Sequence, residues 1–140
     1  YEADAKYGPS FGWNEENSSK NAEVLSAGLT SLENALSNNV NVGYGTDLCW
    51  SPKSYQGDGL LIHEKVCGAA EALRHCTLNN ARIVRMEGKI GEITAGAHAD
   101  LVVLDTNPLK SMNCFSQKSN SIVAVLQAGL PVRDDKLLFD

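Results

Sequence analysis

The hydrophobic periodicity of this chain changes once, near residue 87, and that change limits the folds that the chain can adopt. Before this point, apolar residues recur every three or four positions, which is the pattern of helices packed on one side. After it, short β-type runs alternate with glycine turns, which is typical of a small antiparallel sheet. The sequence therefore predicts an α/β part over residues 1–87 and a β unit over residues 88–140.

The α/β part begins with a leucine stripe over residues 25–36, which predicts a helix. Ser18 or Ser19 is available as the cap of this helix. The next run, "VNVGYGTD" from Val40 to Asp47, alternates in its first five residues with the period of a strand. Helix, short turn and strand in this order are typical of an α/β protein.

A long loop from Leu48 to Gly59 leads to further helical patterns. One apolar stripe from Ile62 to Leu73 predicts a second helix, and a shorter helix is expected from Thr77 to Met86. The β unit is then expected to contain strands in "KIGEI", "ADLVVLD", "SIVAVLQ" and "LPV", with a tight turn near Ala128 and Gly129. We expect the last three runs to pair antiparallel.

Composition narrows the classes of partner. With 140 residues and 43% hydrophobic content the chain is large enough for a core, so we expect a globular protein. Its net charge of −5 and the absence of a basic patch argue against nucleic acid as a partner. No apolar run approaches the roughly 20 residues of a membrane span, so no membrane association is expected. The four scattered cysteines contain no Cys-x-x-Cys pair, which favours reduced thiols and a cytoplasmic location.

Asp47 is the candidate functional residue, because it follows a predicted strand. In α/β folds with parallel strands, ligands gather at the carboxyl ends of the strands, where loops meet. Gly43 and Gly45 carry no side chains and would leave room beside such a site. The alternative from local chemistry is that Asp47 only caps a turn, as Asp often does.

Four stretches, in order and at their intervals, carry a resemblance to a known family: "GYGTDL", "EALRHCTLNNARIV", "GKIGEITAGAHADLVVLDTNPL" and "IVAVLQAGLPV". Together they resemble the C-terminal part of the metal-dependent amidohydrolases, especially the group with imidazolonepropionase-like and prolidase-like dipeptide hydrolases. The third stretch is the most specific, and "GTD" alone would be weak. The resemblance is most secure from Lys20 to Arg133.

The resemblance implies a (β/α)₈ TIM-like barrel that holds one or two divalent metal ions, usually zinc, and a small antiparallel β-sandwich unit. Residues 1–87 would then be the C-terminal remnant of the barrel, with "VNVGYGTD" as its last strand. The resemblance also implies that Asp47 is a metal ligand and the catalytic base, which takes a proton from metal-bound water and passes it to the leaving amine. A metal-bound water with a pKa near about 7 makes this exchange feasible at neutral pH.

The chain departs from the family pattern because the other metal ligands, which the family takes from earlier strands, are absent. A complete barrel needs about 250 residues. His63 and His75 lie in the predicted helices after the strand, and His98 lies in a turn of the β unit, so none of them replaces the missing ligands. The resemblance therefore points to a fragment of an enzyme that hydrolyses amides, dipeptides or cyclic amides and is inactive alone.

Two other readings remain open. The chain could be a short, non-catalytic relative that acts as a binding or structural module, or that completes a barrel with another chain. It could instead bind a metal through His63, Cys67, His75 and Cys76, although adjacent residues on a helix point about 100° apart and suit a tetrahedral site poorly. A barrel remnant would also expose apolar faces, so we expect association with a second copy or with the missing barrel segment.

The loop after Asp47 offers candidate substrate contacts. Trp50 and Tyr55 could line a pocket, Lys53 could bind a carboxylate and Gln56 could bind an amide. The aromatic residues could equally anchor the loop. Because selectivity in such enzymes resides largely in loops, the substrate itself is not specified by this sequence.

Overall fold

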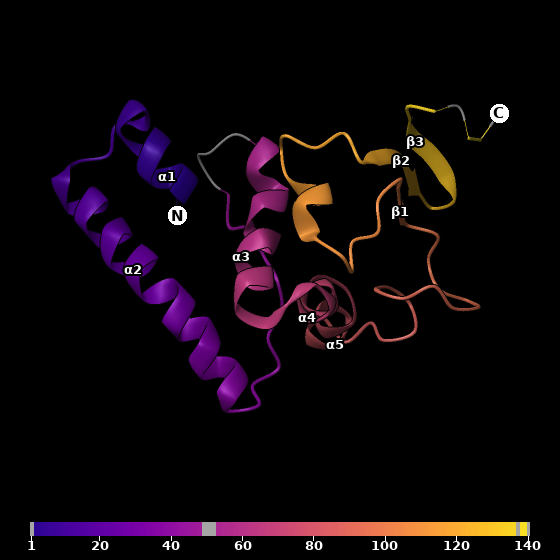
Figure 1. Cartoon of the computed structure of the whole chain (residues 1–140), viewed down its shortest axis with the longest axis horizontal. Coiled ribbons are helices and arrows are strands. Elements are labelled where there is room, and N and C mark those ends of the chain that lie inside the picture. The colour runs from indigo at the N-terminus through magenta and orange to yellow at the C-terminus, as the bar shows by residue number, and fades with distance from the viewer. Residues whose placement is uncertain (1, 49–52, 137, 140) are drawn as a thin grey trace.

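The computed structural model describes residues 2–48, 53–136 and 138–139, and it arranges them as a helical arm, a helical centre and a small sheet (Figure 1). The arm contains α1 and α2, the centre contains α3 to α5, and β1 to β3 lie at the opposite end (Figure 1). The bounds are α1 Glu2–Tyr7, α2 Glu15–Ser37, α3 Asp58–Cys67, α4 Ala69–Arg74, α5 Asn80–Ile83, β1 Leu101–Leu104, β2 Ile122–Gln127 and β3 Leu130–Asp134.

The leucine stripe does form a helix, α2, but its start differs from the prediction. The N-cap is Asn14, whose side chain accepts a hydrogen bond from the backbone N–H of Asn17 at 2.9 Å, so neither Ser18 nor Ser19 caps it. Glu15 and Glu16 fill the first turn. Their negative charges interact favourably with the positive end of the helix dipole, which explains why the helix begins before the leucine stripe.

The prediction of a strand from Val40 to Tyr44 is wrong for this structure, because the segment forms no strand. Its backbone pairs instead with asparagine side chains and with helical carbonyls, including that of His75, which accepts from the Tyr44 N–H at 3.1 Å. Asn80 donates from Nδ2 to the Tyr44 carbonyl at 2.8 Å and accepts at Oδ1 from the Tyr44 N–H at 3.1 Å. Asn79 donates to the Val42 carbonyl at 2.9 Å. Strand geometry needs a neighbouring strand, and alternation in the sequence cannot supply one.

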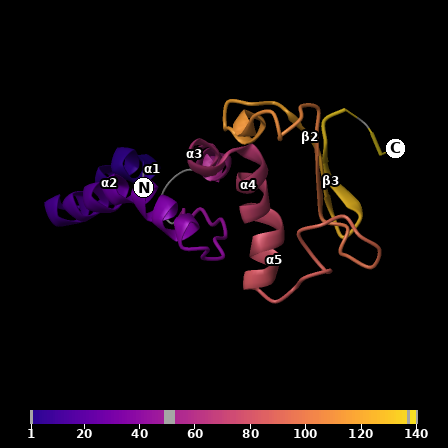
Figure 2. The same ribbon diagram turned by 60° about the horizontal axis from the view of Figure 1, so that its bottom comes forward.

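The second helical stripe is divided by a glycine. Gly68 has φ of 81° and lies between α3 and α4, where only a residue without a side chain is unstrained. The expected helix from Thr77 to Met86 is shorter than predicted, because a π turn, His75–Asn79, precedes α5. Figure 2 shows α4 and α5 in line with each other, between α3 and the sheet.

The three C-terminal runs form the predicted antiparallel sheet, in the order β1-β2-β3. Val103 pairs with Ala124, and Val125 pairs with Arg133. The turn at Ala128 and Gly129 also forms as expected, with both residues at positive φ. Because the described residues form a single sheet, the second layer of the expected sandwich is not present among them.

The "KIGEI" run, residues 89–93, is not a strand. It packs against the helices instead: the backbone at Gly91 is so close to the π turn that a Cβ atom there would lie 2.6 Å from the Thr77 carbonyl oxygen. Backbone approach this close needs glycine and leaves no room for a sheet neighbour on that side.

The main core joins the helical centre to the C-terminal part. Leu60 of α3, Ala72 of α4 and Met112 are buried against one another, and the Met112 N–H donates to Glu64 Oε1 at 3.0 Å. The division of the chain at residue 87 stays a prediction, since a core residue lies on each side of it. The architecture combines helices with a small antiparallel sheet, in line with the predicted α/β class.

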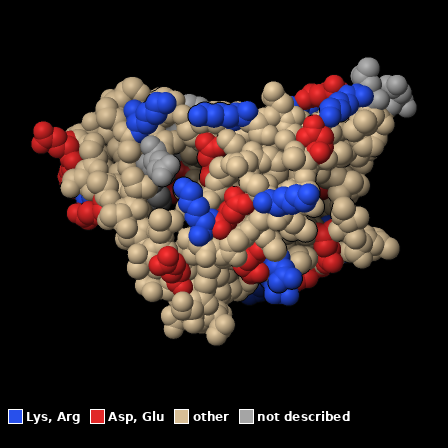
Figure 3. Space-filling view, viewed as in Figure 1, with Lys and Arg blue, Asp and Glu red and all other residues tan. Residues whose placement is uncertain are grey.

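Acidic and basic side chains alternate over the visible face, which carries no broad basic area (Figure 3). Within the described parts of the chain, every helix is too short or too polar to cross a lipid bilayer.

Candidate functional site

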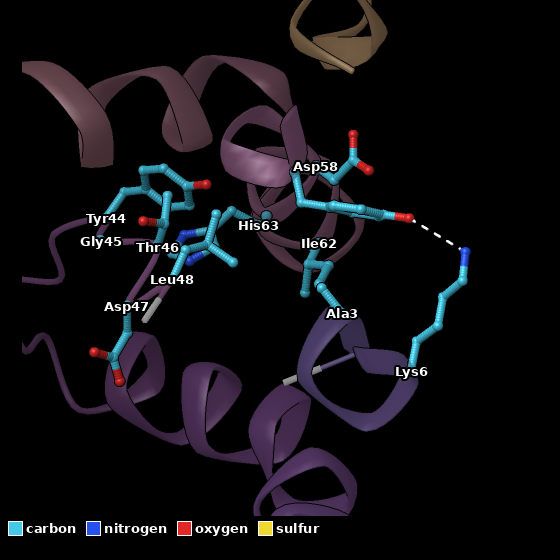
Figure 4. Close-up of a pocket in the computed structure, with 12 residues that line it drawn as sticks. Ala3, Lys6, Tyr44, Gly45, Thr46, Asp47, Leu48, Asp58, Ile62 and His63 are labelled. Atoms are coloured by element: carbon cyan, nitrogen blue, oxygen red, sulfur yellow. Dashed lines mark hydrogen bonds between the residues drawn. The ribbon is translucent and has the colours of Figure 1, made fainter. Parts of the chain in front are cut away.

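A pocket of about 440 Å³ opens between α1, the segment from Tyr44 to Leu48 and the start of α3 (Figure 4). Its walls include Asp47, Lys6 and Tyr55. The volume lies in the range of small-ligand sites, about 300–1,000 Å³. The pocket therefore brings α1 together with residues that lie 38 or more positions further along the chain, since Lys6 and Tyr44 both line it.

Asp47 lies in the wall of this pocket. Its backbone has φ of 48°, in the left-handed region that Asp tolerates better than most residues. The side chain is exposed, and Figure 4 shows its carboxylate at the opposite end of the pocket from Lys6. The catalytic and metal-binding roles of Asp47 stay predictions.

Tyr44 anchors the wall segment that runs from Tyr44 to Leu48. Its hydroxyl donates to the Gln56 carbonyl, and its ring meets His63 edge-on with 5.4 Å between ring centroids. Burial raises the pKa of Tyr44 to about 12, so the phenol keeps its proton at neutral pH. A Cβ on Gly59 would lie 2.7 Å from the Tyr44 hydroxyl, so this contact requires glycine at position 59.

A cluster of Lys6, Tyr7 and Tyr55 forms the other end of the pocket. The Lys6 Nζ donates to the Tyr55 hydroxyl at 3.5 Å, and the two tyrosine hydroxyls are 3.2 Å apart. Lys6 also lies over the Tyr7 ring, 5.0 Å from its centroid. Hydrogen bonds with Tyr7 and Tyr55 raise the pKa of Lys6, and the hydrogen bond from Tyr7 lowers the pKa of Tyr55.

The structure places the candidate substrate contacts of the loop after Asp47 in different positions. Tyr55 does line the pocket, and its contacts with α1 also anchor the loop, so both readings of this residue apply. Gln56 contributes its backbone carbonyl to Tyr44. Trp50, Cys49 and the side chain of Lys53 lie outside the described residues. Lys6 was missed, because no feature of the sequence connects it to Asp47.

The proposed metal cluster of histidines and cysteines is wrong for this structure. His63 Nδ1 lies 2.8 Å from His75 Nδ1, which leaves no room for an ion between them. The Cys67 and Cys76 thiols donate to the carbonyls of His63 and Leu73, at 3.0 and 3.2 Å. Burial raises the pKa of both thiols, the opposite of what a thiolate ligand needs. His98 is exposed and lies outside the pocket wall.

The residues present do not by themselves fit a catalytic metal ion. Zinc at such sites takes about three protein ligands plus water. Across residues 2–48, 53–136 and 138–139, no three or more His, Cys, Asp or Glu side chains are grouped closely enough to hold an ion. Any further ligands would have to come from outside these residues.

Comparisons with known proteins agree with the sequence resemblance. A prolidase solved in complex with N-methylphosphonate-L-proline is 38% identical, with a TM-score of 0.87 over 96% of this chain and 33% of that one. An adenosine deaminase from Xanthomonas campestris with bound zinc is 26% identical, with a TM-score of 0.52 over 73% of this chain and 28% of that one.

The curated relatives include a 5-methylthioadenosine/S-adenosylhomocysteine deaminase from Acetivibrio thermocellus, which is 29% identical over 81% of this chain and 31% of its own length. The chain thus spans about a third of the length of the curated relatives that it matches. The sequence profile of the amidohydrolase family matches residues 11–132. With most of its length matched, this chain belongs to the amidohydrolase family.

Proposed function

We propose that this chain supplies the C-terminal part of a hydrolase that cleaves a C–N bond in a small amide or dipeptide. In this proposal, residues 40–47 become the last strand of a (β/α)₈ barrel when the other strands are present. The observation that carries the proposal is the position of Asp47 in a pocket where α1 and the start of α3 meet. The likeness to a prolidase over 96% of the chain supports it.

Asp47 has the role of proton carrier. Its carboxylate accepts a proton from the water that attacks the scissile carbonyl carbon, and it returns that proton to the nitrogen that leaves. One C–O bond forms and one C–N bond breaks, so the reaction consumes one water and needs no other reactant. The exposure of the Asp47 side chain within the pocket supports this role, because water and substrate can both reach it.

A divalent metal ion, of which zinc is the first candidate, belongs to the complete enzyme and not to this chain alone. Asp47 would be one ligand and the remaining ligands would come from outside the described residues, which provide no cluster of their own. The bound zinc of the Xanthomonas deaminase supports the choice of metal. When bound, such an ion lowers the pKa of a bound water. The isolated chain is accordingly expected to be inactive.

Two alternatives have support of their own. Deamination also cleaves a C–N bond by adding water, and the relatives named as deaminases favour it. The higher identity to the prolidase, 38% against 29%, favours peptide cleavage. The other alternative is a non-catalytic module that binds a partner chain, for which the exposed apolar side chains of α2 offer a surface.

The test uses the full-length protein that contains this chain, assayed against a panel of dipeptides and against nucleosides with ammonia release as the readout. Asp47→Asn removes the proton acceptor and is expected to lower dipeptide turnover at least about 1,000-fold, within the range for loss of a general base and a metal ligand together. Glu92→Gln removes the same charge at an exposed position and serves as the control. Full activity of the Asp47 variant would refute the role, and ammonia release alone would favour the deaminase.

A further inference from the structure

We propose that Lys6 and Tyr55 form a carboxylate-binding subsite across the pocket from Asp47, which makes the substrate a peptide with a free C-terminal carboxylate. This inference rests on the proposed function and specifies its substrate class. It assigns a specificity role to α1, which contributes none of the motifs on which the resemblance depends.

The first argument is the unneutralised charge of Lys6. Its contacts within the described residues are the two phenols, Tyr7 and Tyr55, and no carboxylate pairs with it there. An ammonium group has three N–H donors, of which Tyr55 takes one. The other donors can bind a ligand, and the raised pKa of Lys6 keeps the group charged throughout the neutral range.

The second argument is that Tyr55 is oriented as a donor. Its ring packs edge-on against Tyr7 at 5.9 Å between centroids, which fixes the direction of its hydroxyl. Lys6 donates to the Tyr55 oxygen, and either hydroxyl of the Tyr7–Tyr55 pair can be the donor; with Tyr7 as the donor, the Tyr55 O–H remains to donate to a ligand. An ammonium and a phenol side by side match the two oxygens of a carboxylate, and hydrogen bonds of this kind to an ionised group are the stronger class.

The third argument concerns polarity along the pocket. Lys6 and Asp47 lie at opposite ends in Figure 4, so the electrostatics favour one orientation of an anionic ligand. A carboxylate is attracted to the Lys6 end and repelled by Asp47, which places the more distant amide bond of the ligand near Asp47.

Asp58, the other carboxylate of the wall, keeps its negative charge and weakens this attraction, but it does not pair with Lys6 among the described residues. Its two oxygens accept hydrogen bonds from the backbone and side chain of Gln117, at 3.0 and 3.1 Å, so they already have donors. A neutral nucleoside would have no use for the Lys6 charge, which separates this inference from the deaminase alternative.

The experiment compares one dipeptide with its own C-terminal amide, using the full-length protein. The wild-type protein is expected to prefer the free acid by at least about 10-fold in kcat/KM. Lys6→Met is expected to lower kcat/KM for the acid about 10- to 100-fold, the effect of losing charged hydrogen bonds, and to leave the amide within about 3-fold. Tyr55→Phe should do the same more weakly, and Lys6→Arg should restore most of the preference.

Lys110→Met is the matched control, because Lys110 is exposed and lies outside the pocket wall. Equal turnover of acid and amide by the wild-type protein, or equal losses on both substrates in Lys6→Met, would overturn the subsite while the hydrolase function stands. If Lys6→Met fails to fold, Tyr55→Phe and the wild-type comparison decide the question. Absence of turnover on every dipeptide would overturn the proposed function, and the subsite with it.

Discussion

His63 Nδ1 and His75 Nδ1 lie 2.8 Å apart, so one of these nitrogens carries a hydrogen and donates it in a hydrogen bond that the other nitrogen accepts. His75 is fully buried, and its second ring nitrogen, Nε2, has no hydrogen-bond partner among the described residues; the nearer carboxylate oxygen of Glu71 lies 3.7 Å away. The pair joins α3 to the π turn that follows α4. A second proton at the contact would place two N–H groups face to face.

This pair predicts that acid weakens the fold. Burial lowers the pKa of both histidines below the ordinary value of 6.5; the charge of His75 adds to the effect on His63, and the charge of Glu71 partly opposes the effect on His75. The unfolded chain therefore binds more protons than the folded chain below pH 6.5. The contribution of the pair to the free energy of unfolding should be fully present above pH 6.5 and should be lost as the pH falls below that value. Urea unfolding at pH 7.5 and 5.5 measures this difference.

The control for the pH effect removes both imidazoles, with His63→Phe and His75→Leu together. Glu71 of α4, Tyr44 and Cys67 are titratable groups beside the pair; Tyr44 stays neutral because its pKa is about 12, and burial raises the pKa of the Cys67 thiol, so it stays neutral too. The double variant should show a smaller fall in unfolding free energy between the two pH values. An unchanged fall would assign the pH dependence to other groups.

Gly43 is predicted to be irreplaceable in a way that Gly45 is not. A Cβ at position 43 would lie 2.3 Å from Asn80 Oδ1 and 2.6 Å from Ile83 Cδ1, whereas a Cβ at position 45 meets nothing within 4 Å. Gly43→Ala should therefore cost about 1–3 kcal/mol of unfolding free energy through overpacking. Gly45→Ala should change it by less than about 1 kcal/mol. Equal effects of the two substitutions would contradict the packing described here.

The isolated 140-residue chain is predicted to bind zinc no more tightly than about millimolar, because one carboxylate holds a divalent ion weakly. It should also hydrolyse no dipeptide above background. Elemental analysis and a dipeptide assay on the chain and on Asp47→Asn provide the measurement. Stoichiometric zinc that disappears in the variant would reveal a site completed by a second copy.

The isolated chain is also predicted to self-associate. Leu25 and Leu29 of α2 are 38% and 46% exposed, and Val40 is 55% exposed, so apolar surface lies open along the helical arm. Sedimentation should show species larger than a monomer at high concentration. Leu25→Lys with Leu29→Lys should shift the distribution toward monomer, since both positions are exposed. A compact wild-type monomer at all concentrations would support a self-contained module.

The elements that could be predicted are those whose backbone hydrogen bonds form within the element itself or with the next element along the chain. The leucine stripe became α2, and the runs of β1, β2 and β3 pair with their neighbours in sequence. Residues 40–44 and 89–93 carry strand patterns but form no strands here. In both cases the backbone meets a helix, and periodicity does not reveal such contacts.

The residues of the candidate site also differ in whether the sequence indicates them. Asp47 could be proposed from the sequence because ligands gather at the carboxyl ends of strands in α/β folds, and its role stays a prediction. Lys6 could not, because its contact with Tyr55 spans 49 residues and depends on how α1 packs. The cap at Asn14 could not be predicted, because Ser18 and Ser19 are equally good capping residues and lie nearer the leucine stripe.

The asparagine contacts with residues 42–44 have a consequence for assembly. Asn80 of α5 forms hydrogen bonds with both the N–H and the carbonyl of Tyr44. These bonds fix the alignment of this segment against a helix before any strand lies beside it. A slip by one residue would break both hydrogen bonds and move Asp47 out of place. The segment can thus act as a template with a preset register, and strands that arrive later would take their alignment from it.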